Sequence, residues 1–174
     1  MAHADFSNFA ASSRAETLQS VVDAYDALAS DCSNWVANLA NASSLVWHAY
    51  HALGVRVNWA GFYVLDAEAA NTLVLGPFQG KVACQSIRFG AGICGRAAEN
   101  RSTEVIPDVH ADKAHIACDG DTNSEIVVPL VADGRVVGVL DIDCLDKNGF
   151  GPDDAAVLEQ LAQHISSSCR WVFA

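Results

Sequence analysis

Hydrophobic residues recur at helical intervals in the first third of the chain. Ser13 and Glu16 have capping-box spacing, and the apolar residues that follow predict an amphipathic helix over residues 14–29. A second pattern of the same period, over residues 35–53, ends at Gly54, which suits the left-handed position after a helix. We therefore expect two helices whose apolar faces pack against the rest of the fold.

From residue 55 onward the apolar period changes to two, which is typical of strands. A short helix over residues 93–100 interrupts the strands, and a closing helix begins at Pro152. Helices at both ends and about six antiparallel strands between them predict an α+β fold with a central sheet. The expected strands span residues 55–65, 72–75, 83–89, 103–106, 124–131 and 136–143.

The overall composition is that of a globular protein. The 174 residues are 51% hydrophobic and 18% charged, which suits a single domain over residues 1–174, with residues 1–13 as a flexible N-terminal tail. A net charge of -11 with scattered Lys and Arg disfavours nucleic acid as a partner. The sequence begins without a signal-peptide pattern and holds no apolar run of ~20 residues. We therefore expect a cytoplasmic protein without a membrane partner.

Two aspartates interrupt the apolar hairpin of residues 124–143. Asp141 and Asp143 are two apart in a run of Val, Leu and Ile, so they share one face of a strand. Two carboxylates on a buried face repel each other unless a ligand cation or a shared proton lies between them. The alternative is an exposed polar face with both side chains in water. Trp59 and Tyr63 are likewise either ordinary sheet packing or two walls of a small pocket.

The turn of this hairpin decides which face Glu125 occupies. A two-residue Asp133-Gly134 turn pairs Ala132 with Arg135 and puts Glu125 on the face opposite Asp143. A three-residue loop over 133–135 instead pairs Ala132 with Val136 and sets Glu125 across from Asp143. We expect the second arrangement, with Gly134 at the left-handed position.

Six cysteines are spread along the chain without a CxxC pair, so we expect no metal site. Cys32 and Cys169 fall in helical patterns and are expected to be buried thiols. Cys94 lies in GAGICG at 90–95, which matches a dinucleotide-binding fingerprint only formally, because repeated βαβ units are missing. The glycines place Cys94 near a helix N-terminus, which lowers a thiol pKa, so it is either a reactive thiol or simply a buried one.

A long polar segment, residues 108–123, holds another candidate thiol. Cys118 is adjacent to Asp119 and lies seven residues before Glu125. Loops of this length in compact domains are usually functional or disordered. A thiol within reach of acids favours function, so the residues alone predict a pocket of thiols and carboxylates.

Six motifs along the chain together resemble one family. They are NWAGFY at 58–63, LGPFQGKVAC at 75–84, GICG at 92–95, HIACD at 115–119, NSEIVVPL at 123–130 and GVLDID at 138–143. In combination these motifs resemble the GAF-fold free methionine-R-sulfoxide reductases, over residues 18–165.

The resemblance implies an oxidoreductase that reduces the R epimer of free methionine sulfoxide without a cofactor or metal. It also implies that thioredoxin or a thioredoxin-like protein reduces the enzyme's cysteines again after each turnover. A homodimer is left open. The cysteines that match the family are Cys84, Cys94 and Cys118. The residues that match its substrate pocket are Trp59, Tyr63, Glu125, Asp141 and Asp143, and backbone N-H groups at Ile116 and Ala117 suit the substrate carboxylate.

The chemistry of sulfoxide reduction gives the cysteines and the carboxylates different expected roles. A thiolate that attacks sulfoxide sulfur needs an acid to protonate the departing oxygen, and crowded carboxylates can supply it. We expect Cys118 to attack and Cys84 to resolve the sulfenic acid as a disulfide, with Cys94 as a second relay. The alternative function is a GAF module that senses a small ligand without catalysis.

Overall fold

The computed structural model describes residues 6–9, 13–112 and 120–172. In this part of the chain six strands form one antiparallel sheet in the order β3-β2-β1-β6-β5-β4. The strands are β1 (Val57–Leu65), β2 (Thr72–Gly80), β3 (Ser86–Arg88), β4 (Glu104–Ile106), β5 (Ser124–Ala132) and β6 (Arg135–Cys144). The helices are α1 (Arg14–Ala29), α2 (Trp35–Ala52), α3 (Gly92–Asn100) and α4 (Pro152–Ser168), with a 3-10 turn η1 (Val109–Ala111). The predicted α+β fold is confirmed.

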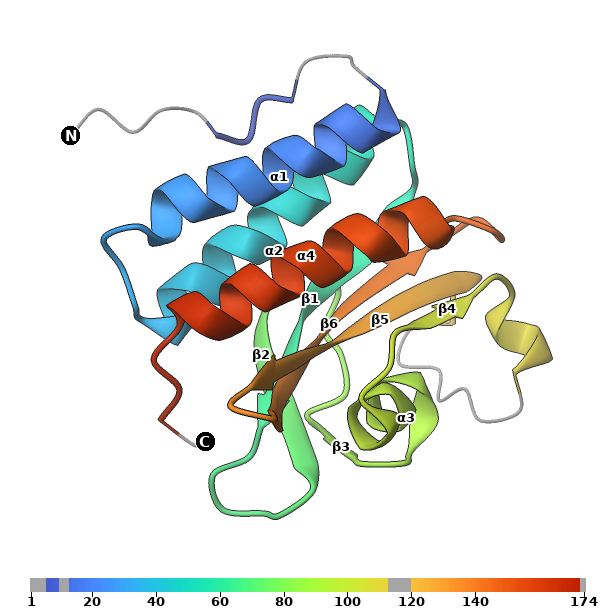
Figure 1. Cartoon of the computed structure of the whole chain (residues 1–174). Coiled ribbons are helices and arrows are strands. Elements are labelled where there is room, and N and C mark those ends of the chain that lie inside the picture. Colours follow the sequence, from blue (N-terminus) through green and yellow to red (C-terminus); the bar gives the residue numbers. More distant parts are fainter. Residues whose placement is uncertain (1–5, 10–12, 113–119, 173–174) are drawn as a thin grey trace.

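The sheet has a different cover on each face (Figure 1). Helices α2 and α4 pack directly on one face, and α1 lies across both of them. The short α3 packs on the other face, against β3, β5 and β6. Burying both faces of the sheet produces two separate apolar clusters, and the smaller cluster, on the α3 side, is the one that contains Trp59, Tyr63 and Cys94.

The first helix begins where the sequence predicts. Ser13 Oγ accepts a hydrogen bond from Glu16 N at 3.3 Å, and the Glu16 carboxylate accepts one from Ser13 N at 3.0 Å. This reciprocal capping box satisfies two N-H groups that have no partner inside the helix. Helix α2 is followed by Gly54 with φ of +72°, which confirms the predicted left-handed residue. In the described part of the chain, no helix is both long and apolar enough to cross a bilayer.

Strand β2 is longer than the sequence predicts. The expected strand ends before Gly76 and Pro77, whereas β2 continues to Gly80. The register of β1 and β2 shifts between Gly61 and Tyr63, so that Gly76 and Pro77 form a bulge in β2 opposite the single residue Phe62. A bulge interrupts the ladder of hydrogen bonds, so proline, which has no N-H to donate, is accommodated there.

The hairpin of β5 and β6 corrects the predicted turn but confirms its consequence. Ala132 pairs with Arg135, so the turn has two residues, and Asp133 and Gly134 both have positive φ, as a type I′ turn requires. The prediction of a three-residue loop is therefore wrong. A register shift between Leu130 and Val131 supplies the missing residue. Beyond this bulge Glu125 lies opposite Asp143, as expected.

Candidate active site

A cavity of about 190 Å³ lies between the sheet and α3. It is smaller than the ~300–1,000 Å³ pockets that hold drug-sized ligands, so it suits a molecule the size of an amino acid. Strands β1, β5 and β6 supply its floor, α3 one wall, and the chain around β3 another. The residues that line it are Trp59, Tyr63, Val82, Ala83, Cys84, Ser86, Ile87, Arg88, Ala91, Gly92, Ile93, Cys94, Thr122, Glu125, Asp141 and Asp143.

Five of the pocket residues expected from the sequence lie on strands, and all five line this cavity. Pairing of β1 with β6 sets Trp59 opposite Asp143 and Gly61 opposite Asp141. Residues opposite each other in antiparallel strands share a face, and so do residues two apart. Trp59, Tyr63, Glu125, Asp141 and Asp143 therefore project into one space. Ile116, Ala117 and Cys118 lie outside the described residues.

The aromatic wall is built from three stacked rings. The ring centroid of Trp59 lies 5.7 Å from that of Tyr63 and 5.2 Å from that of Phe78. Gly61 makes room for this stack, because a Cβ there would lie 2.2 Å from Phe78 Cβ. Trp59 Nε1 donates to the Lys81 carbonyl at 3.2 Å, which fixes the ring edge. The wall is therefore a rigid apolar surface.

The acidic wall is buried. Glu125 and Asp141 are 5% and 6% exposed. The Asp141 side chain is hydrogen-bonded with those of Cys94 and Glu125. Its Oδ1 atom, by contrast, is buried without a hydrogen-bond partner among the described residues. A buried carboxylate oxygen without a partner carries a desolvation cost, so the site favours a ligand that brings a donor or a positive charge to this atom.

Burial sets the protonation of these acids. It raises the pKa of Asp141 to about 7, although hydrogen bonds from Cys94 and Glu125 oppose the rise. Burial, together with the negative charges of Asp141 and Asp143, holds the pKa of Glu125 well above its usual range. Near neutral pH the pair therefore retains a proton that it can donate.

These raised pKa values predict a pH dependence of stability. The unfolded chain ionises Asp141 near pH 4, whereas the folded protein holds the proton to about pH 7. The stabilisation from this group is thus complete below about pH 4 and is lost as pH rises toward 7, on the order of 1 kcal/mol per pH unit. Asp141→Asn should remove this part of the decline when urea unfolding is measured between pH 5 and 8. The exposed Asp121→Asn should keep the wild-type slope, and an unchanged slope in Asp141→Asn would contradict the assignment.

Cys94 does not behave as helix position alone suggests. It is the third residue of α3, close to the predicted helix N-terminus. However, burial first, and then the charges of Asp141 and Glu125, raise the pKa of its thiol well above the usual value. The interpretation that the helix terminus activates this thiol is therefore corrected, because desolvation and two nearby acids outweigh a helix dipole.

The other cysteines separate into two groups. Cys84 lines the cavity and is disulfide-bonded. Cys32, Cys94, Cys144 and Cys169 are free thiols. Cys144 is fully buried in the cluster on the helix side of the sheet, and Cys169 belongs to the same cluster. Among the free thiols of the described residues, Cys94 is thus the one that lines the cavity.

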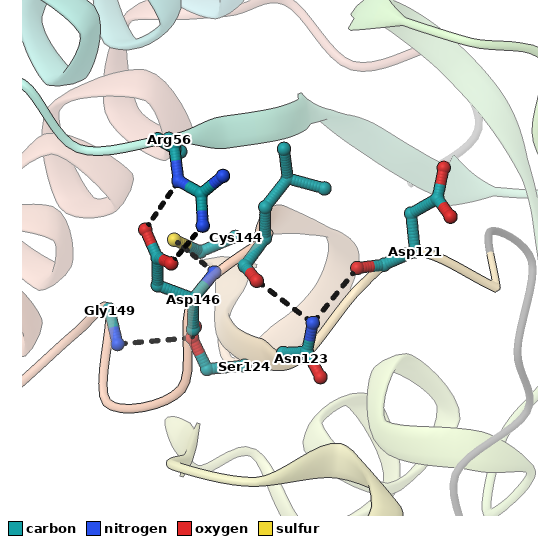
Figure 2. Close-up of polar contacts among 8 residues, drawn as sticks. Arg56, Asp121, Asn123, Ser124, Cys144, Asp146 and Gly149 are labelled. Carbon is teal, nitrogen blue, oxygen red and sulfur yellow. Dashed lines mark hydrogen bonds and ion pairs between the residues drawn. The ribbon is translucent and has the colours of Figure 1, made fainter.

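The chain that leads into Glu125 is fixed by the loop after β6 (Figure 2). Asn123 Nδ2 donates to the Leu145 carbonyl at 2.8 Å and to the Asp121 carbonyl at 3.1 Å. Ser124 Oγ donates to the Asp146 carbonyl at 2.5 Å and accepts from Gly149 N at 3.0 Å. These bonds hold the start of β5 in place, so they fix the backbone that presents Glu125 to the cavity.

An ion-pair network behind the cavity was not apparent from the sequence. Arg96 Nη2 on α3 lies 3.0 Å from Glu104 Oε2 on β4 and 2.9 Å from Asp112 Oδ2 after η1. Its positive charge opposes the rise in the pKa of Glu125. The partners are eight and sixteen residues away and on different elements. No local spacing rule connects them.

The fold and the pocket together indicate the protein family. Residues 39–168 match the model of the GAF domain family, and the chain belongs to that family. The curated relatives include the free methionine-R-sulfoxide reductase of Saccharomyces cerevisiae, 54% identical over 96% of this chain and 94% of that protein. The Escherichia coli protein of the same name is 43% identical over 81% of each chain.

A solved structure also resembles this one closely. It is free methionine-R-sulfoxide reductase from Neisseria meningitidis in complex with its substrate, with a TM-score of 0.84 and 41% identity. The alignment covers 92% of this chain and 93% of that one. The likeness therefore extends over nearly the whole fold.

Proposed function

We propose that this protein reduces free L-methionine-R-sulfoxide to methionine. The observation that carries the proposal is the buried Asp141 Oδ1 atom, which has no partner among the described residues and lies in a cavity that also contains a cysteine and a protonated acid pair. An ammonium group supplies the donor that this oxygen lacks. The similarity to reductases that bear this name supports the same substrate.

In this proposal the two ends of the substrate contact different walls of the cavity. Its ammonium group would pair with Asp141 and Asp143, and its S-methyl group would pack on Trp59, at the apolar wall. Glu125, whose pKa is raised by burial and by its acidic neighbours, would donate a proton to the sulfoxide oxygen. We keep the proposal that backbone N-H groups at Ile116 and Ala117 bind the substrate carboxylate, although these residues lie outside the described ones.

The redox steps balance with two thiols. A cysteine thiolate attacks the sulfoxide sulfur, which forms a bond between the two sulfurs, and the sulfoxide oxygen is protonated. The oxygen then passes to the cysteine sulfur as the substrate S-O bond and the S-S bond break, which releases methionine and leaves a sulfenic acid on the cysteine. A second thiol then attacks the sulfenic acid, which gives a disulfide and water. Methionine sulfoxide gains two electrons, and the two thiols lose them. A dithiol protein such as thioredoxin would reduce the disulfide and restore the enzyme.

We assign the attack to Cys118 and the second thiol to Cys84. The position of Cys84 at the cavity and its disulfide support its role as the second thiol. Cys118 lies outside the described residues. Cys94, a free thiol in the same cavity, remains the proposed second relay.

The test is turnover with separated epimers. Purified protein, thioredoxin, thioredoxin reductase and NADPH should oxidise NADPH with free methionine-R-sulfoxide and show no activity above background with the S epimer. A sensor module would bind one of these compounds and consume no NADPH. Binding without turnover of either epimer would therefore exclude the proposed reaction and favour the sensor.

A further inference from the structure

Three potential metal ligands from three elements converge in the cavity. Cys94 comes from α3, Glu125 from β5 and Asp141 from β6. One ligand atom of each, the thiol sulfur and a carboxylate oxygen from each acid, lies within 4.8 Å of the other two. All three residues are buried, at 4%, 5% and 6% exposure. They form a compact set rather than a scattered acidic surface.

Two hydrogen bonds connect these three potential ligands to one another. Asp141 is hydrogen-bonded with both Cys94 and Glu125, so it lies at the centre of the set. Independently, its Oδ1 atom is buried without a partner among the described residues. A metal ion between the three groups would take the place of these hydrogen bonds and also satisfy the remaining oxygen.

We propose that Cys94, Glu125 and Asp141 bind a zinc ion reversibly, and that the bound ion blocks the substrate site in the cavity. Zinc accepts thiolate and carboxylate ligands, at about 2.3 Å from sulfur and 2.0–2.2 Å from oxygen. Magnesium and calcium take oxygen ligands, so the thiol disfavours them. Three protein ligands leave a fourth tetrahedral position, and the cavity that they line, of about 190 Å³, has room for a water molecule there.

An ion can reach this site from solvent. The cavity is also lined by Val82, which is 89% exposed, so the lining extends from the buried acids to the molecular surface. The bound ion would occupy the place that the substrate ammonium group needs, next to Asp141. Zinc is therefore an inhibitor in this proposal rather than a cofactor.

Sequence spacing gives no sign of this site. Zinc ligands are usually recognised as pairs separated by a few residues, and these three are 31 and 16 residues apart by their numbers. The expectation of no metal site followed from the missing CxxC pairs. Only the packing of α3 on the hairpin brings the three side chains together.

Cobalt and zinc titrations of the oxidised protein test the site. Oxidised protein is used because the Cys84 disulfide removes that thiol from competition. One cobalt ion per chain should give a thiolate-to-cobalt charge-transfer band, and one equivalent of zinc should displace it, since zinc binds more tightly than cobalt. Isothermal titration calorimetry then gives the zinc affinity.

The matched variants are Cys94→Ser and Cys144→Ser. Both replace a buried free thiol, but Cys144 lies on the opposite face of the sheet. Cys94→Ser should abolish the cobalt band and weaken zinc binding at least about tenfold, because loss of an outer-shell partner alone costs ~10–100-fold. Cys144→Ser should keep both signals. Equal cobalt bands and zinc affinities in Cys94→Ser and the wild type would overturn the proposal.

Two further measurements make the test robust. If Cys94→Ser does not fold, Asp141→Asn removes a ligand without changing a thiol, and it should also weaken zinc binding at least about tenfold. An unchanged zinc affinity in that variant would overturn the site. None of these readouts requires turnover, so failure of the proposed reductase function would leave them intact. Where that function holds, zinc should raise the KM for methionine sulfoxide without changing kcat, and an unchanged KM would overturn the blocking role.

Discussion

A Cys118→Ser variant is expected to release no methionine, even in the first turnover. Serine hydroxyl cannot replace a thiolate in attack on sulfoxide sulfur, so no sulfenic acid forms. Cys84→Ser should keep the attacking thiol and release about one methionine per enzyme, then stop, because thioredoxin finds no disulfide to reduce. Rapid-quench measurement of methionine with pre-reduced enzyme and no added reductant separates these two outcomes.

The choice of Cys118 over Cys94 now has a stronger basis than adjacency to acids. Burial and the charges of Asp141 and Glu125 raise the pKa of the Cys94 thiol, so little thiolate is present at neutral pH. Cys94→Ser should therefore keep the first-turnover burst. Cys144→Ser is the matched control, since that thiol is buried on the helix side of the sheet, and it should keep both the burst and steady turnover. Loss of the burst in Cys94→Ser with a retained burst in Cys118→Ser would reverse the assigned roles.

The elements that the sequence predicts well depend on local signals. The capping box at Ser13 and the positive φ at Gly54 are contained within a few residues, and both are confirmed. The turn at Asp133 and Gly134 is also local, but its effect on register is not. A bulge near Val131 shifts the pairing by one residue, so the correct face for Glu125 was predicted from an incorrect loop.

The chemistry of the site depends on distances that spacing does not encode. Position near a helix N-terminus suggested a low pKa for Cys94, and the structure gives the opposite direction, because the thiol is buried and, in addition, lies close to the charge of Asp141. The ion pairs of Arg96 and the stacking of Phe78 could not be predicted from spacing either, because their partners come from other elements. Alternation along strands put Asp141 with Asp143 and Trp59 with Tyr63 on shared faces, since residues two apart share a face whatever the tertiary packing, but only the resemblance joined them in one pocket. The environment of those residues could be read only from the packed structure.

Methionine sulfoxide within a peptide is expected to be a far poorer substrate than the free amino acid. Asp141 is buried, and its Oδ1 atom has no partner among the described residues. A free ammonium group supplies charge and donors to this oxygen, whereas a peptide amide is neutral and has a single N-H. Enzymes whose buried polar groups lose their partner discriminate by ~10⁴–10⁵-fold. We therefore expect kcat/KM for a peptide to fall by at least about 1,000-fold, a bound that allows for partial rescue by the amide N-H.

Derivatives of one amino acid isolate the cause of this discrimination. N-acetyl-methionine-R-sulfoxide removes the ammonium charge and adds little bulk, and it should lose most of the activity that the peptide loses. The methyl ester keeps the ammonium group and should retain more activity than the N-acetyl compound. Steady-state kinetics of both in the thioredoxin-coupled assay make the comparison. If the N-acetyl compound were turned over as fast as the free amino acid, the buried acids could not be the ammonium site, and the small cavity of about 190 Å³ would have to exclude peptides by size alone.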